Sequence, residues 1–246
     1  MSVCAALGLS AREIREEFSD FFAPVQSSFD KILPKEVLHF VYLRIIKKLF
    51  SRFERIFAKQ RFGLISSKVF LPVYNHSDRK NSHFGFGSEL NLDDVLISDV
   101  VKAICSDLRL AKPYKIIELN RSFSDAGIFA YDPSQYFVRN YIGNTEKKLN
   151  ILSIGSGIIE NLSKSLDVGY PFDEVYDSFL YEQFRSTEAF FKWCDREAHV
   201  NYVRISEFPD ECKVSSAEQL VELADKRFEG LDKSIFSSFL NESDSV

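Results

Sequence analysis

Apolar and polar residues alternate along the chain in a pattern that predicts helices first near the N-terminus. Residues 34–57 carry apolar side chains at helical spacing on one face and Lys or Arg on the other, which predicts a long amphipathic helix. A second helix is predicted over residues 93–108. Ser10 and Glu13 form a capping box, which predicts that a further helix begins there.

Short apolar runs separate the predicted helices and have the length of strands: residues 68–74, 114–119, 151–154 and 201–205. Pro72 lacks a backbone N–H, so it favours a place near a strand end or a sheet edge. Residues 75–88 are polar and predict a loop. Further helices are predicted over residues 173–196 and 216–228. Another is predicted to begin at Asp132-Pro133, with Asp as the N-cap.

Strands that alternate with helices predict an α/β fold, with a mostly parallel sheet flanked by helices. The 246 residues suffice for one domain with a sizeable core. No internal repeat or low-complexity linker interrupts the chain, so we expect one domain over residues 1–232. Residues 233–246 are rich in Ser and Asp and predict a flexible C-terminal tail.

The composition is that of a globular protein, with 45% hydrophobic and 27% charged residues. A net charge of -5 does not point to nucleic acid as a partner. No apolar run has the length of a membrane span, and the N-terminus lacks the basic region of a signal peptide. We therefore expect a cytoplasmic protein, with peripheral membrane contact or secretion left open.

The cysteines and histidines are scattered, without a C-x-x-C pair: Cys4, Cys105, Cys194, Cys212, His39, His76, His83 and His199. Such spacing predicts isolated reduced thiols rather than a disulfide framework. Although His76 and His83 share a polar segment, no further ligand completes a zinc site. The sequence therefore predicts no metal site.

The tripeptide Asp125-Ala126-Gly127 comes after the predicted strand at residues 114–119. A carboxylate at the end of a strand can accept the proton of a serine hydroxyl within hydrogen-bond reach. The small residues Ala126 and Gly127 allow a close approach of the backbone at this turn. Taken alone, the tripeptide favours an Asp that only stabilises a turn, because Asp-Ala-Gly is a common turn sequence.

The flanking residues add a family resemblance. The segment from Asp125 to Pro133, the later Leu152-Ser-Ile-Gly-Ser-Gly157 and the strand at residues 201–205 resemble, in this order, the motifs of the patatin-like lipid acyl hydrolases. In that family an Asp-Gly-Gly or Asp-Gly-Ala segment supplies the Asp of a Ser–Asp catalytic dyad. The resemblance implies that Asp125 is the dyad base, in a turn supported by Ala126 and Gly127. Ala126 departs from the family's first Gly.

The resemblance also implies an activity. Patatin-like enzymes of the phospholipase A type hydrolyse acyl esters of lipids, so a lipid or membrane-surface substrate is expected, with no metal and no organic cofactor. Asp125 is expected just past the end of a central strand, beside residues 151–154. The family's Gly-x-Ser-x-Gly motif is absent from the sequence. We therefore expect a patatin-like domain incomplete at its N-terminus, with the nucleophile on a missing N-terminal segment or a separate chain.

Two alternatives stay open. Ser2 lies in the apolar N-terminal segment, which resembles the end of a helix, and has no flanking glycines; this favours an inert side chain over a nucleophile. The chain can also be an inactive remnant or a lipid- or protein-binding module, in which Asp125 is a retained turn residue. The basic face of residues 34–57 fits either anionic lipid headgroups or plain solvation of a helix face.

Overall fold

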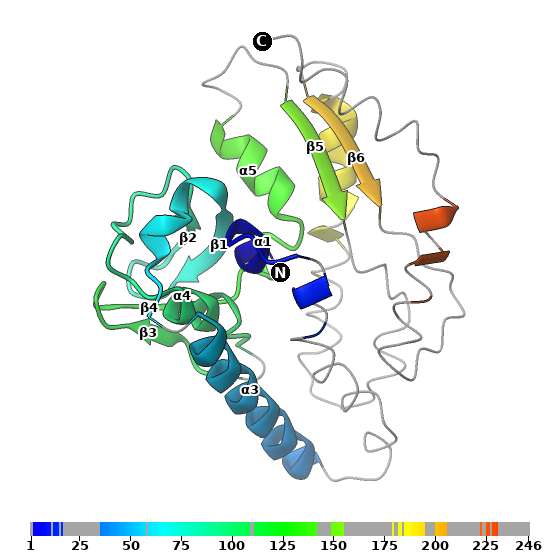
Figure 1. The fold of residues 1–246 in the computed structure, drawn as a ribbon. Coiled ribbons are helices and arrows are strands. Elements are labelled where there is room, and N and C mark those ends of the chain that lie inside the picture. The colour runs from blue at the N-terminus through cyan, green and yellow to red at the C-terminus, as the bar shows by residue number, and fades with distance from the viewer. Residues whose placement is uncertain are drawn as a thin grey trace. The chain divides into compact units, whose positions relative to one another are not determined.

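The computed structural model describes residues 2–10, 12–14, 16, 35–57, 59–108, 111–141, 149–154, 179, 182–183, 185–194, 200–205, 222, 225–226 and 228–230 (Figure 1). The chain divides into two compact units, Met1–Pro133 and Ser134–Val246. Each unit is treated by itself below. The domain spanning residues 1–232 stays a prediction, and the tail at 233–246 lies outside the described residues.

The first unit begins with α1, Ser2–Ala6, whose Val3 and Cys4 are buried. The predicted capping box follows and is confirmed. The Ser10 N–H donates to Glu13 Oε2 at 2.7 Å, and the Glu13 N–H donates to Ser10 Oγ at 3.3 Å. The hydrogen bonds from Ser10 lower the pKa of the Glu13 carboxyl.

The long amphipathic helix is confirmed as α3, Lys35–Phe57. It buries Phe53 and Phe57 in the core of the unit. The second predicted helix is α4, Ile97–Ile104, which is shorter than the predicted 93–108. The helix begins only at Ile97, because Leu96 has an extended backbone and forms a single antiparallel β-bridge with Arg61.

Four strands form the sheet of this unit: β1 (Phe70–Asn75), β2 (Lys80–Gly85), β3 (Tyr114–Ile116) and β4 (Arg121–Ser124). Their order is β2-β1-β4-β3, and every neighbouring pair is antiparallel. The prediction of a mostly parallel sheet flanked by helices is therefore wrong. Short turns join β1 to β2 and β3 to β4, and such turns reverse the chain, whereas parallel neighbours need a long crossover.

The prediction of a loop over residues 75–88 is also wrong, because β2 occupies its middle. β2 has a polar sequence, but it pairs with β1 along its whole length, from Phe70 opposite Gly85 to Asn75 opposite Lys80. Pro72 agrees with its predicted place, since β4 pairs with β1 only at Tyr74 and Asn75. At Pro72, β1 is therefore paired with β2 but not with β4, so this part of β1 lies at an edge of the sheet.

The core of the first unit lies between this sheet and the helices. Phe84 of β2 and Phe123 of β4 are fully buried and meet edge to face, with ring centroids 4.9 Å apart. Val73, Ile116 and Val100 are buried in the same cluster. The cluster thus ties α4 to the two inner strands β1 and β4.

The second unit holds α5 (Pro133–Tyr141, beginning as predicted at the last residue of the first unit), β5 (Leu149–Ile154) and β6 (Val200–Ile205). The strands at 151–154 and 201–205 are thereby confirmed, and they pair in parallel. β5 is more exposed than a central strand, with Ile154 75% exposed. The Phe191 and Tyr202 rings stack at 3.7 Å.

Two predicted segments are only partly visible. Residues 185–194 are helical, within the predicted 173–196. Residues 222, 225–226 and 228 are helical within the predicted 216–228, and residue 229, one past its end, is helical too. The last three residues of the family-like motif at 152–157 lie outside the described residues. Among the described helices, none has the length and apolar character required to cross a bilayer.

Candidate functional site

Asp125 directly follows β4, the inner strand between β1 and β3. This agrees with the prediction that it lies just past the end of a central strand. The predicted neighbour is wrong, because residues 151–154 belong to β5, which pairs with β6 in a separate sheet. The strand that leads to Asp125 is also not the predicted 114–119. β3 ends at Ile116, and a turn leads to β4.

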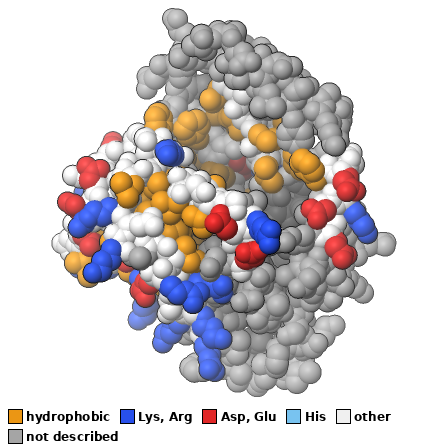
Figure 2. All heavy atoms as spheres, in the orientation of Figure 1, with side chains coloured by type: hydrophobic (Ala, Val, Ile, Leu, Met, Phe, Trp, Pro, Cys, Tyr) orange, Lys and Arg blue, Asp and Glu red, His pale blue; other side chains and the backbone are white. Residues whose placement is uncertain are grey.

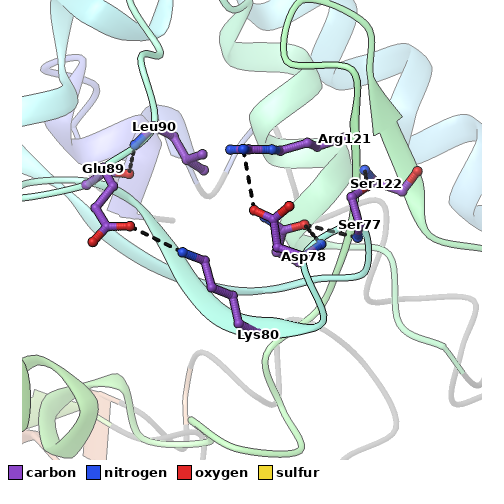
Figure 3. A network of polar contacts seen from close by, with 9 residues as sticks. Ser77, Asp78, Lys80, Glu89, Leu90, Arg121 and Ser122 are labelled. Atoms are coloured by element: carbon purple, nitrogen blue, oxygen red, sulfur yellow. Dashed lines mark hydrogen bonds and ion pairs between the residues drawn. The ribbon is translucent and has the colours of Figure 1, made fainter.

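Polar contacts hold β4 against the turn between β1 and β2 (Figure 3). The Ser122 N–H donates to Ser77 Oγ at 3.0 Å, and the Arg121 guanidinium lies 3.5 Å from the Asp78 carboxylate. The buried Asn75 side chain shapes the turn, since its Oδ1 accepts the N–H groups of Ser77 and Asp78 at 3.1 Å each. These bonds fix the strand that carries Asp125.

The backbone of Asp125 is anchored to the end of α4. Its N–H donates to the Ser106 carbonyl at 3.1 Å. One carboxylate oxygen, Oδ2, accepts the Gly127 N–H at 3.0 Å, while Ala126 between them is buried. The turn continues with the Phe129 and Ala130 N–H groups donating to the Ala126 carbonyl. The tripeptide therefore holds a partly exposed carboxylate in one orientation.

Two serines adjoin Asp125, and both hydroxyls have other partners. Ser106 Oγ is buried and donates to the Lys102 carbonyl at 2.7 Å, one helical turn back. Ser124 Oγ is fully buried and lies 2.8 Å from His76 Nε2, with which it shares a hydrogen bond. Ser2 is the first residue of α1. Neither of the two adjoining serines is presented to solvent as a nucleophile would be.

Cys105, at the end of α4, also lies in the electrostatic field of Asp125. Burial and the negative charge of Asp125 raise the pKa of the Cys105 thiol to about 11. The thiol is therefore protonated at neutral pH, whereas a cysteine nucleophile needs a lowered pKa. Cys105 is thus a poor nucleophile, although it lies near the carboxylate.

The described residues also bear on metal binding. Among them, no group of three or more His, Cys, Asp or Glu side chains is arranged to hold a metal ion. What the site can do chemically is accept a proton at Asp125, from a hydroxyl that approaches from outside the turn.

No family model matches the chain, and a search of curated proteins finds none that is similar to it.

The His76–Ser124 pair was not among the predicted site residues. A sequence signal for it exists, because side chains alternate between the two faces of a sheet. His76 directly follows β1 and is on the same face as Tyr74. Ser124 ends β4 and is on the same face as Ser122. Tyr74 is directly opposite Ser124, which brings the histidine to the same face. The signal becomes usable only once the pairing of β1 with β4 is known.

Proposed function

We propose that the chain is the base-carrying part of a serine-type lipid acyl hydrolase, similar to the patatin-like enzymes. Asp125 accepts the proton of a serine Oγ supplied by a segment or chain outside this sequence. The Oγ then bonds to the acyl carbonyl carbon, the ester C–O bond breaks, and the alcohol leaves with the proton. Water hydrolyses the acyl-serine in a second step and releases the fatty acid.

The orientation of Asp125 carries this proposal. A carboxylate that acts as a base must stay near its target throughout the reaction, and this one is fixed by Ser106 through its N–H and by Gly127 through its Oδ2. The partial exposure of Asp125 leaves it accessible to an approaching hydroxyl. The motif resemblance from Asp125 to Pro133 and at residues 152–157 supports the substrate class, acyl esters of lipids.

The test supplies the nucleophile. A strand, a Gly-rich loop and a Gly-x-Ser-x-Gly elbow are fused ahead of Met1, and hydrolysis of short acyl esters and phospholipid vesicles is measured. Turnover is expected in the fusion, and Asp125→Asn should lower kcat by about 10²–10⁴, the usual contribution of a positioned acid or base.

A matched control uses Glu118→Gln, an exposed carboxylate in the turn before β4. This variant should keep the turnover of the fusion. Equal rates for Asp125→Asn and the parent fusion would contradict the proposal, provided that circular dichroism shows both to be folded. A fusion that folds but shows no turnover with any acyl ester would favour the alternative, in which Asp125 stabilises the turn of a non-catalytic binding module.

A further inference from the structure

The exposed face of α3 carries a row of cations. Arg44, Lys47, Lys48, Arg52 and Arg55 line a shallow groove of about 440 Å³ together with Ser51. The other four cations follow Arg44 by three, four, eight and eleven residues, and Ser51 follows it by seven. This spacing keeps all six side chains on one side of the helix. In Figure 2 blue Lys and Arg side chains gather in the lower part of the molecule, over α3.

The opposite face of α3 is fixed in the first unit. Phe53 and Phe57, which lie on that face, are buried in its core. At the border between the two faces, the Glu54 carboxylate pairs with the Lys102 ammonium of α4. The cationic row therefore cannot turn away from solvent without disrupting the core. Arg44, Lys47 and Lys48 are all exposed. With 1.5 Å of rise per residue, the row from Arg44 to Arg55 is about 16 Å long and straight.

We infer that this face of α3 is a docking surface for an anionic lipid bilayer. Positive side chains near a membrane surface are attracted by the negative potential of anionic headgroups. The Lys and Arg side chains have long aliphatic stems that let their charged ends reach phosphate and carboxylate groups while the stems cover apolar surface. A row of cations along one side of a helix can contact several headgroups of a planar bilayer surface at once.

The overall charge favours a bilayer over a nucleic acid, because nucleic-acid-binding domains are usually strongly basic, whereas the net charge of this chain is -5. The groove on α3 is lined by Lys, Arg and Ser. Among the described residues that line it, none has an aromatic side chain on which a base could stack. The choice of a lipid surface also rests on the proposed function, since α3 and Asp125 belong to the same unit and α4 contacts both.

The test is flotation of the full chain with vesicles. Vesicles of phosphatidylcholine are compared with vesicles in which about one third of the lipid is phosphatidylserine, at about 0.1 M and about 0.5 M salt. Binding is expected to the anionic vesicles at low salt and should fall at high salt. The triple variant Arg44→Gln, Lys47→Gln, Lys48→Gln should bind at least about tenfold more weakly.

A second triple variant controls for net charge. Lys68→Gln, Lys112→Gln, Lys115→Gln removes the same charge from exposed positions away from α3, and its binding should stay within about twofold of the parent. Arg44→Lys, Lys47→Arg, Lys48→Arg keeps the charge and should keep the binding. Equal losses in the two neutralised variants would overturn the inference, as would absence of binding to anionic vesicles.

Two further measurements distinguish membrane docking from the proposed hydrolase activity and from binding of a nucleic acid. Asp125→Ala should bind anionic vesicles like the parent, so a failed hydrolase test leaves the docking result unaffected. Single-stranded and duplex DNA are titrated with the same α3 variants. Tight binding to DNA that depends on Arg44, Lys47 and Lys48, without binding to vesicles, would replace the bilayer by a nucleic acid and overturn the inference.

Discussion

His76 Nε2 lies 2.8 Å from the buried Ser124 Oγ, immediately before Asp125. The bond joins the end of β1 to the end of β4 on the face of the sheet opposite Phe123. It adds to the bond from the Asp125 N–H to Ser106, so the residue before the carboxylate and the carboxylate-bearing residue itself are both anchored. Because burial lowers the pKa of His76, this relationship has a consequence for acid stability.

The first prediction concerns pH. A lowered pKa means that the folded protein favours the neutral His76 ring, while the ring in the unfolded chain titrates near its ordinary value of 6.5. The stability from this group is therefore complete above that value and is lost as the pH falls below it. Urea unfolding at about pH 8 and about pH 5 should show that His76→Gln is less acid-sensitive than the parent.

His83 provides the comparison, since burial lowers the pKa of its ring as well. His83→Gln should also reduce the acid sensitivity, and the double variant should reduce it more than either single one. A His76→Gln protein that loses as much stability on acidification as the parent would contradict the assignment of a partly buried, neutral ring to His76.

The second prediction is that this chain alone has no measurable esterase turnover on short acyl esters or phospholipid vesicles. A Ser–Asp dyad needs its nucleophile and its oxyanion donors together, and one lost donor costs about 10²–10³ in rate. The measurement compares the chain with Asp125→Ala in the same assay. Turnover well above that of the variant would show that a serine of this chain, with Ser2 the first to test, is the nucleophile.

The third prediction concerns the polar cluster between α3, α4 and β3. Lys102 is 9% exposed and pairs with Glu54 and, at 3.5 Å, with Asp99, while the Tyr114 hydroxyl donates to Asp99 at 2.6 Å. Lys102→Met leaves the partly buried Asp99 without its cation. We expect a loss of about 2 kcal/mol in the free energy of unfolding, below the 3–5 kcal/mol of a fully buried pair because Glu54 stays hydrated.

Denaturant unfolding measures this loss, and Lys115→Met on β3 is the control because Lys115 is exposed. Adding Asp99→Asn to Lys102→Met should recover part of the loss. A Lys102→Met protein as stable as the parent would mean that the ion pairs contribute nothing beyond what methionine packing replaces.

The fourth prediction concerns Tyr114 itself. Burial and the hydrogen bond to Asp99 raise the pKa of its hydroxyl to about 12. Tyr114→Phe should lower stability by about 1 kcal/mol, because the partly buried Asp99 Oδ1 loses one donor while the Lys102 ammonium still lies 3.5 Å away. In an ultraviolet titration of the folded protein, the same variant should lack one phenol that ionises near pH 12. A titration curve unchanged by the substitution would contradict the assignment.

The fifth prediction compares two glycines with positive φ. A Cβ at Gly85 (φ +97) would lie 2.0 Å from the Val69 carbonyl oxygen, whereas a Cβ at Gly8 (φ +85) would meet nothing within 4 Å. Gly8→Ala should cost about 1–2 kcal/mol, for the backbone alone. Gly85→Ala should cost clearly more, because β2 must also shift from the chain before β1. Equal unfolding midpoints for the two variants would contradict this difference.

The long helix and the capping box could be predicted from local patterns, whereas β4, the strand before Asp125, is not among the predicted strands. The apolar spacing of residues 34–57 and the Ser10–Glu13 box act within a few residues of each other, so they survive in any fold. The sheet direction could not be predicted in this way. β2 is polar, with Phe84 its one fully buried apolar residue, and its pairing with β1 depends on contacts between segments rather than on its own pattern.

The site was only partly predictable for the same reason. Asp125 was found from its neighbours in sequence, whereas His76 lies 48 residues before Ser124 and meets it through the register of β1 and β4. The Ser106 carbonyl that holds the Asp125 N–H lies in the segment just after α4, 19 residues before Asp125 in the sequence. Such partners depend on tertiary structure, for which the sequence shows only the residue types.

The anchoring of Asp125 has a consequence for the order of assembly. Its N–H is held by Ser106 and its Oδ2 by Gly127, and neither bond involves a nucleophile. The carboxylate is therefore pre-organised before a serine arrives, and docking of a nucleophile-bearing partner needs no ordering of this side chain. Since ordering a rotamer-rich side chain costs about 0.5–1.5 kcal/mol on association, a fixed acceptor favours productive encounters between separately folded parts.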